Sequence, residues 1–140
     1  MTLPLCESCK PSGVCQFGVI EQSLIAPHSS TGIVRCPPNF QGLPGMAHGG
    51  WIAAVFDEIM GREAWRHAPL IYTARLTVHF LKPVPVDRDL HYVVTSEPRA
   101  QRHWHVAAEL RDGVDNLLLA TGSGDFRHPR PSADRPATVA

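Results

Sequence analysis

The sequence has little of what would direct a protein to a membrane or a nucleic acid. Its 140 residues carry 13 Lys and Arg against 13 Asp and Glu, so the formal net charge is zero and no basic run stands out. No apolar run approaches the roughly 18 residues of a membrane span. The start, MTLPLCESCKP, has neither the basic nor the apolar region of a secretory signal. We therefore expect a cytoplasmic protein that binds neither nucleic acid nor membrane.

The chain has four cysteines, and their spacing bears on metal binding. Of Cys6, Cys9, Cys15 and Cys36, only the first two form a close pair, and a second close pair, as in many structural zinc sites, is missing. The pattern favours reduced thiols in a reducing compartment. A zinc site on Cys6, Cys9 and Cys15, with Cys36 as a distant fourth ligand, stays open as the alternative. We otherwise expect no metal and no cofactor.

Alternating apolar and polar residues predict strands over most of the chain. The predicted strands are residues 16–26, 31–36, 70–82, 86–97, 101–111 and 116–127. Turns are expected at 27–30, 83–85, 97–99 and 112–113, where Pro, Gly and Asp gather. Residues 1–15 read as an irregular Cys-containing segment, 16–128 as one folded domain, and 129–140 as a Pro-rich flexible tail.

A helix is predicted from Gly49 or Gly50 to about Arg66, inside GMAHGGWIAAVFD and the residues that follow it. Apolar residues recur there at helical spacing and also fill the other sides, which predicts burial on more than one face. Pro69 is expected to stop the helix. Asp57 lies among apolar neighbours, so a solvated position is not the expected outcome for it.

The order of these elements predicts the fold class. Two strands, one long apolar helix and four strands joined by short connections imply an antiparallel sheet. To bury such a helix, a sheet of about six strands has to curl around it. We therefore expect an α+β protein in which a curved antiparallel sheet wraps one long central helix.

Three stretches then resemble a known family. They are FQGLPGMAHGG at residues 40–50, the pair Asp57-Glu58, and YTARLTV at 72–78 running on to KPVP at 82–85. They are similar to the hot-dog fold acyl-CoA thioesterases of the 4-hydroxybenzoyl-CoA and phenylacetate-pathway type, in the branch of the carboxyl-terminal modulator protein. One departure is Gly42, where several relatives carry Asn or Gln; the adjacent Gln41 is a possible substitute.

The resemblance implies a hot-dog fold, hydrolysis of an acyl-CoA thioester to a free acid and CoA, and no cofactor beyond the CoA of the substrate. It also implies a homodimer or a dimer of dimers. The chemistry of thioester hydrolysis needs a donor for the oxyanion and a base or nucleophile. Backbone amides of Gly49 and Gly50 at a helix N-terminus suit the first need. Asp57 suits the second, either attacking the carbonyl or activating water.

The spacing of these groups implies a site shared between subunits. Eight residues of helix rise about 12 Å, whereas a catalytic carboxylate must come within roughly 3 Å of its target or of one bridging water. Gly49 and Asp57 of one chain therefore should not serve the same thioester. Two antiparallel helices around a two-fold axis would place Gly49 of one chain near Asp57 of the other.

Four further residues are candidates for the site. Thr73 matches the threonine that assists the acid in the family branch, and its hydroxyl can orient a water or bond Asp57. His48 is expected to hold the glycine turn beside the substrate rather than to act as a base. Arg75 and Lys82, with Arg88 as a third cation, are candidates for the CoA phosphates. By strand alternation, Arg75 shares a face with Thr73.

Two other functions fit the same scaffold. One is a non-catalytic protein that binds acyl-CoA or lipid, and the other is a hydratase of 2-enoyl chains, for which the expected Asp and His spacing is missing. The acyl group, and the choice between CoA and a carrier-protein thioester, depend on the pocket. The side chains expected to set its length are Trp51, Phe56, Met60, Phe80 and Trp104.

Overall fold

The computed structural model describes residues 1–68 and 70–129. Its elements are β1 (Val19–Ala26), β2 (Ser29–Arg35), a short 3-10 helix (Pro38–Phe40), α1 (Gly49–Trp65), β3 (Tyr72–Phe80), β4 (Asp89–Arg99), β5 (His103–Asp112) and β6 (Leu118–Arg127). The helix stop expected at Pro69 and nearly all of the expected tail, residues 130–140, lie outside the described residues. None of the helices in the described part of the chain has the length and apolarity needed to cross a bilayer.

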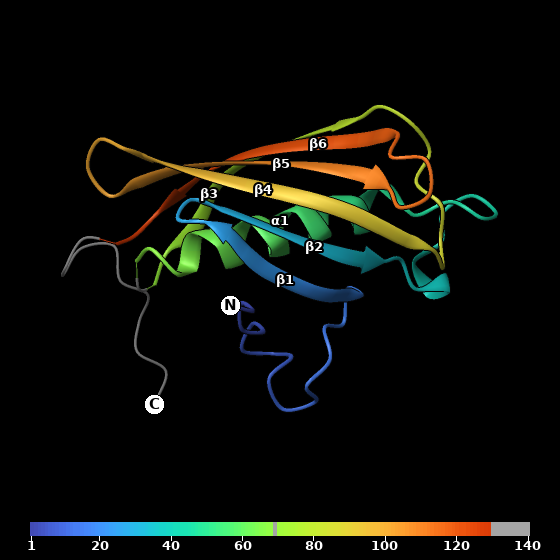
Figure 1. The fold of residues 1–140 in the computed structure, drawn as a ribbon, viewed down its shortest axis with the longest axis horizontal. Helices are drawn as coiled ribbons and strands as arrows, with labels where there is room; N and C mark the ends of the chain where they lie inside the picture. Colours follow the sequence, from blue (N-terminus) through green and yellow to red (C-terminus); the bar gives the residue numbers. More distant parts are fainter. Residues whose placement is uncertain (69, 130–140) are drawn as a thin grey trace.

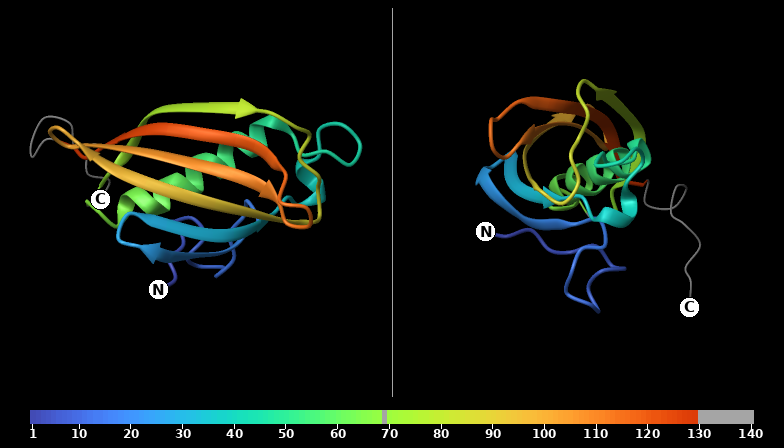
Figure 2. Two further views of the ribbon diagram at one scale, coloured as in Figure 1. Left: turned by 45° about the horizontal axis from the view of Figure 1, so that its top comes forward. Right: turned by 90° about the vertical axis from the view of Figure 1, so that its right-hand side faces the viewer.

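The strands form one antiparallel sheet in the order β1-β2-β4-β5-β6-β3. The helix α1 lies along the concave face of this sheet (Figure 1). In a view along the helix, the strands curl around it (Figure 2). The prediction of a six-stranded sheet wrapped around one long helix is confirmed.

The connections correct two details of the predicted order. The strand β3 pairs with β6 at the sheet edge, and β4 lies between β2 and β5, so residues 81–88 cross to another part of the sheet instead of forming a hairpin. The turn predicted at 97–99 is also wrong, because pairing between β4 and β5 continues to Arg99 opposite His103. The chain reverses at residues 100–102, where Gln101 and Arg102 adopt positive φ of 48° and 40°.

The helix is buried on more than one face, as its composition predicts. Val55, Phe56 and Ile59 have no exposed surface, and they pack against the inward side chains of the sheet. The buried set also includes three charged residues of the C-terminal half of the helix, Glu58, Arg62 and Glu63. Arg62 Nε donates to Glu58 Oε2 at 2.6 Å with both side chains buried. Removing one member of such a pair leaves a buried charge without a partner and lowers the free energy of unfolding by about 3–5 kcal/mol.

Glu63 anchors a second buried cluster beyond this pair. Its Oε2 accepts hydrogen bonds from Ser96 Oγ at 2.6 Å and from Arg66 Nη2. The ring of His67 reaches the same carboxylate at 3.2 Å and stacks on Trp104 with ring centroids 3.9 Å apart. Burial lowers the pKa of His67 from its ordinary value of 6.5, with Arg66 acting in the same direction and Glu63 opposing. The neutral imidazole is therefore the form that this cluster holds.

The depressed pKa predicts a stability loss in mild acid. Above the unfolded-state pKa of about 6.5, His67 is neutral in both states and contributes no pH dependence. Below it, the unfolded chain binds a proton more readily than the folded chain, so the free energy of unfolding falls until the folded pKa is passed. Denaturant titrations between pH 7.5 and about pH 5 should show this fall. It should shrink in His67→Gln and persist in His91→Gln, an exposed histidine control; an equal slope in both variants contradicts the assignment.

Candidate active site

A loop held by backbone hydrogen bonds brings residues 41–48 and the KPVP stretch at 82–85 together at the start of α1. Between residues 41 and 48 the chain turns back on itself, with the Gly42 amide donating to the Met46 carbonyl at 2.8 Å. The Ala47 amide donates to the Val84 carbonyl at 2.7 Å, and Met46 bridges to Pro85. The KPVP stretch therefore lies beside the residues that lead into the helix.

His48 caps the N-terminus of α1. Its backbone is extended, and its ring Nδ1 accepts from the Gly50 amide at 2.8 Å. This bond satisfies one of the amides that a helix start leaves unpaired. Within residues 1–68 and 70–129, no acceptor for the Gly49 amide occurs. One donor at the positive end of the helix dipole is therefore free for a ligand.

The Gly49 residue opens onto a pocket of about 670 Å³. Leu43, Met46, Ile52 and Phe80 supply apolar walls, and Lys82 is the cationic residue on the lining. Phe80 keeps 58% of its surface exposed. Phe80 is the one of the five side chains expected to set pocket length that lines this pocket. The sequence analysis missed Leu43 and Met46, because the sequence of a Pro- and Gly-rich loop does not indicate which way the loop folds.

The structure gives a reason for Gly42, the departure from the family pattern. A Cβ at this position would lie 3.2 Å from the Cα of His48, which is tighter than ordinary packing. The neighbouring Gln41 uses its side-chain oxygen to accept from the Gly45 amide inside the loop. Gly42 thus allows the loop to close on the helix cap, and Gln41 helps to hold the loop.

Asp57 lies on α1 eight residues after Gly49, and it contacts Thr73 of β3. Thr73 Oγ1 donates to Asp57 Oδ1 at 2.6 Å. Both residues are exposed in the single chain, which corrects the expectation that Asp57 would avoid solvent. The reason is that β3, at the sheet edge, leaves this side of α1 uncovered. The carboxylate is therefore oriented by a hydroxyl and open on its other side.

A β-bulge in β3 makes the contact between Thr73 and Asp57 possible. The register with β6 shifts between Thr73 and Arg75, so one residue is added and alternation breaks there. Thr73 faces the helix, whereas Arg75 points to the opposite face, with Nε 3.9 Å from Asp125 Oδ2. The prediction that Arg75 and Thr73 share a face is wrong, because simple alternation does not anticipate the extra residue.

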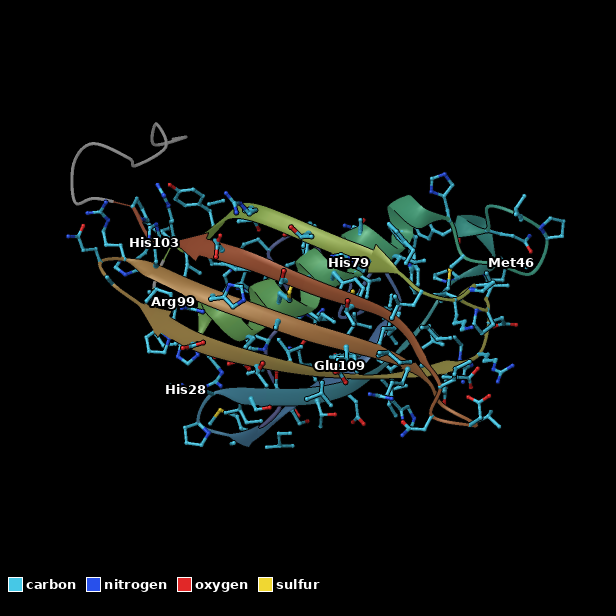
Figure 3. All side chains as sticks on the ribbon, turned by 90° about the horizontal axis from the view of Figure 1, so that it is seen from above. His28, Met46, His79, Arg99, His103 and Glu109 are labelled. Atoms are coloured by element: carbon cyan, nitrogen blue, oxygen red, sulfur yellow. The ribbon has the colours of Figure 1, made fainter. Side chains whose placement is uncertain are left out.

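The candidate phosphate-binding cations do not gather in one place. Arg75 lines a hollow of about 260 Å³ together with Arg99 and His103. Figure 3 shows Arg99 and His103 at one end of the sheet and Met46, beside the helix start, at the other. Arg88 donates to Asp112 Oδ1 at 2.7 Å. Within one chain, Lys82 is the predicted cation that lies on the pocket at Gly49.

The two reactive elements stay apart along the helix. Gly49 and Asp57 both belong to the continuous helix α1, whose rise over eight residues is about 12 Å. The Gly49 amide with its pocket and the Asp57–Thr73 pair therefore form two half-sites in one chain. No group of three or more metal-ligating side chains occurs in residues 1–68 and 70–129, the four cysteines included.

Comparison with known proteins assigns the chain to a family. The family model described as thioesterase superfamily matches residues 44–118, which is more than half of the chain. A crystal structure of a thioesterase superfamily protein is 26% identical, with a TM-score of 0.68. The match covers 77% of this chain and 55% of that one, so this chain spans about half the length of that relative. A comparison with curated proteins gave no match.

Two further solved structures show the same fold over most of their length. AziG of S. sahachiroi is 18% identical with a TM-score of 0.72, over 91% of this chain and 99% of that one. A phenylacetic acid degradation-related putative thioesterase of Ralstonia eutropha JMP134 is also 18% identical with a TM-score of 0.72, over 89% and 92%. The fold is the hot-dog fold that the motifs implied. With the family model covering both the helix start and Asp57, the chain belongs to the thioesterase superfamily.

Proposed function

We propose that the protein hydrolyses an acyl-CoA thioester to a free carboxylic acid and CoA. The Gly49 amide, with the dipole of α1 behind it, receives the thioester oxygen as negative charge develops on it. Asp57 activates a water for attack on the carbonyl carbon, or attacks that carbon itself. CoA leaves as the thiol, and the reaction draws on no metal or redox group.

The observation that carries the proposal is the hydrogen bond from Thr73 to Asp57 beside an open carboxylate oxygen. Because the hydroxyl donates to Oδ1 at 2.6 Å, it fixes the orientation of the carboxylate and leaves Oδ2 for a water or a substrate. An Asp held in this way on an uncovered helix face has the arrangement of a general base or nucleophile.

A second copy of the chain is the proposed source of the missing half-site. The exposed side of α1 carries small residues, Gly50, Ala53 and Ala54, between the helix start and Asp57. Beside it, the outer edge of β3 pairs with no strand in the described residues, and Tyr72 and Phe80 on it are exposed. An unpaired edge strand and a small-residue helix face both favour close association with another chain. An antiparallel copy brings its Gly49 toward Asp57.

The pocket favours an acyl group of moderate size. Its apolar walls at Leu43, Met46 and Phe80 suit a hydrocarbon or aromatic group whose carbonyl points to Gly49. Lys82 on the same lining offers a positive charge to an anionic part of the substrate.

Release of free thiol from a panel of short-chain, medium-chain and aromatic acyl-CoAs tests the function. We expect steady turnover on at least one member, with loss of turnover in Asp57→Ala. Tight binding of acyl-CoA without release would identify a binding protein on the same scaffold. Hydration of a 2-enoyl-CoA with the thioester intact would identify a hydratase. Either of these results contradicts the proposal.

A further inference from the structure

The four cysteines occupy two kinds of environment. Cys15 and Cys36 are buried, and burial raises the pKa of both thiols, that of Cys36 to about 11. Thiols of this kind are poor nucleophiles near neutral pH. Cys6 and Cys9 share a turn in the N-terminal segment, in which Cys6 is partly exposed and Cys9 is buried.

The backbone of this turn brings the two residues within reach of one disulfide. The amides of Cys9 and Lys10 both donate to the Cys6 carbonyl, each at 3.1 Å. A turn closed by such an i to i+3 bond holds its end Cα atoms less than about 7 Å apart. A disulfide usually spans Cα separations of about 4.4–6.8 Å. The turn therefore needs little movement to be bridged.

Hydrogen bonds surround both sulfur atoms. The Gln16 amide donates to Cys9 Sγ at 3.3 Å, and Ser8 Oγ lies 3.4 Å from Cys6 Sγ. The Gln16 amide is the main cause of a lowered pKa at Cys9, which the Cys6 and Ser8 hydrogen bonds lower further, although burial opposes the shift. Cys9 keeps only 2% of its surface exposed. The pair thus combines an accessible sulfur with a covered one whose thiolate is stabilised.

We propose that Cys6 and Cys9 form a redox-active dithiol that closes reversibly into a disulfide by exchange with a low-molecular-weight disulfide such as oxidised glutathione. Cys6, as the thiolate, attacks one sulfur of the reagent, whose S–S bond breaks and releases the first thiol. Cys9, as the thiolate, then attacks Cys6 Sγ and expels the second thiol. Two electrons and two protons pass from the cysteines to the reagent, which ends as two thiols.

The dithiol is separate from the Gly49 half-site of the proposed hydrolysis. Cys6 lines a hollow with Trp65 and Ile71, at the C-terminal end of α1, whereas the Gly49 pocket lies at the N-terminal end. The oxidation of the pair is therefore measurable whether or not the protein turns over acyl-CoA.

Incubation of the full chain with oxidised glutathione, followed by alkylation and peptide mass spectrometry, tests the proposal. We expect Cys6 and Cys9 to lose two hydrogens as one disulfide, while Cys15 and Cys36 stay alkylatable and dithiothreitol restores all four thiols. Equal oxidation at Cys15 or Cys36, or no disulfide between Cys6 and Cys9, would overturn the proposal. So would a metal ion in the purified protein that the two thiols hold and that blocks exchange.

Three variants separate the roles of the two sulfurs. In Cys9→Ser, the reaction should stop at a stable mixed disulfide of Cys6 with glutathione. In Cys6→Ser, the covered Cys9 should react at least tenfold more slowly than the Cys6 and Cys9 pair in the unaltered chain. Cys36→Ser is the matched control and should close the disulfide at the unaltered rate. A mixed disulfide that forms on Cys9 as fast as on Cys6 contradicts the assigned order of attack.

Discussion

Replacing Asp57 by Asn is expected to lower kcat for acyl-CoA hydrolysis by about 10³-fold, because positioned general bases contribute about 10²–10⁴-fold. The amide has nearly the same shape and can still accept the hydrogen bond that Thr73 donates to Oδ1. It can neither take a proton from water at neutral pH nor form a mixed anhydride. Asp57 is exposed in the single chain, so the fold should keep its stability. Thiol release under saturating substrate measures the effect.

Variants of Thr73 show whether the fall in kcat comes from the chemical step at Asp57. Thr73→Val keeps the shape of the side chain and removes the donor, so kcat should fall by about 10-fold, in line with the loss of one hydrogen bond to a charged group. Thr73→Ser restores the donor and should recover most of the rate. KM should change little in either variant, because the hydroxyl orients Asp57. An Asp57→Asn enzyme with kcat close to that of the unaltered enzyme, or with a rise in KM as its only change, contradicts the role assigned to Asp57.

The second large effect is recovery of activity in a mixed dimer. One chain carries Asp57→Ala and keeps its Gly49 amide; the other carries Gly49→Val and keeps its Asp57. Each homodimer should be inactive, since every site in it lacks one half. The mixed dimer has one site with both halves intact and should recover about half the turnover of the unaltered dimer, by the count of one working site in two. Differently tagged chains, purified in sequence, allow this measurement.

Gly49→Val is a suitable partner because the fold has room for it. A Cβ at Gly49 would lie 3.7 Å from Phe80 Cε1, an ordinary contact, whereas a Cβ at Gly50 would lie 3.0 Å from His48 Nδ1 and disturb the cap. The valine side chain would stand between the Gly49 amide and the pocket. A mixed dimer as inactive as its two parents would contradict the shared site, and so would a single chain that turns over substrate without a partner.

The sequence predicted the fold well because its signals are periodic and local. The apolar helix from Gly49 and the alternation of the strands identified six strands around one helix, with most bounds within a few residues. The errors arose where a long-range choice overrides a local signal. Pro98 suggested a turn, yet pairing with β5 carries β4 on to Arg99. The local sequence patterns also did not predict that β3 pairs with β6 at the edge of the sheet.

In the candidate site, too, some features follow from the sequence alone and others only from the tertiary structure. The sequence by itself determined the residue types, Gly49 at a helix start and Asp57 eight residues on, because helix spacing follows from the order of residues alone. The tertiary structure decided which groups meet. A single bulge turns Thr73 toward Asp57 and Arg75 away, and the bond from Ala47 to Val84 brings Lys82 to the Gly49 pocket. These contacts depend on register and loop closure, which are set by packing between segments far apart in the chain.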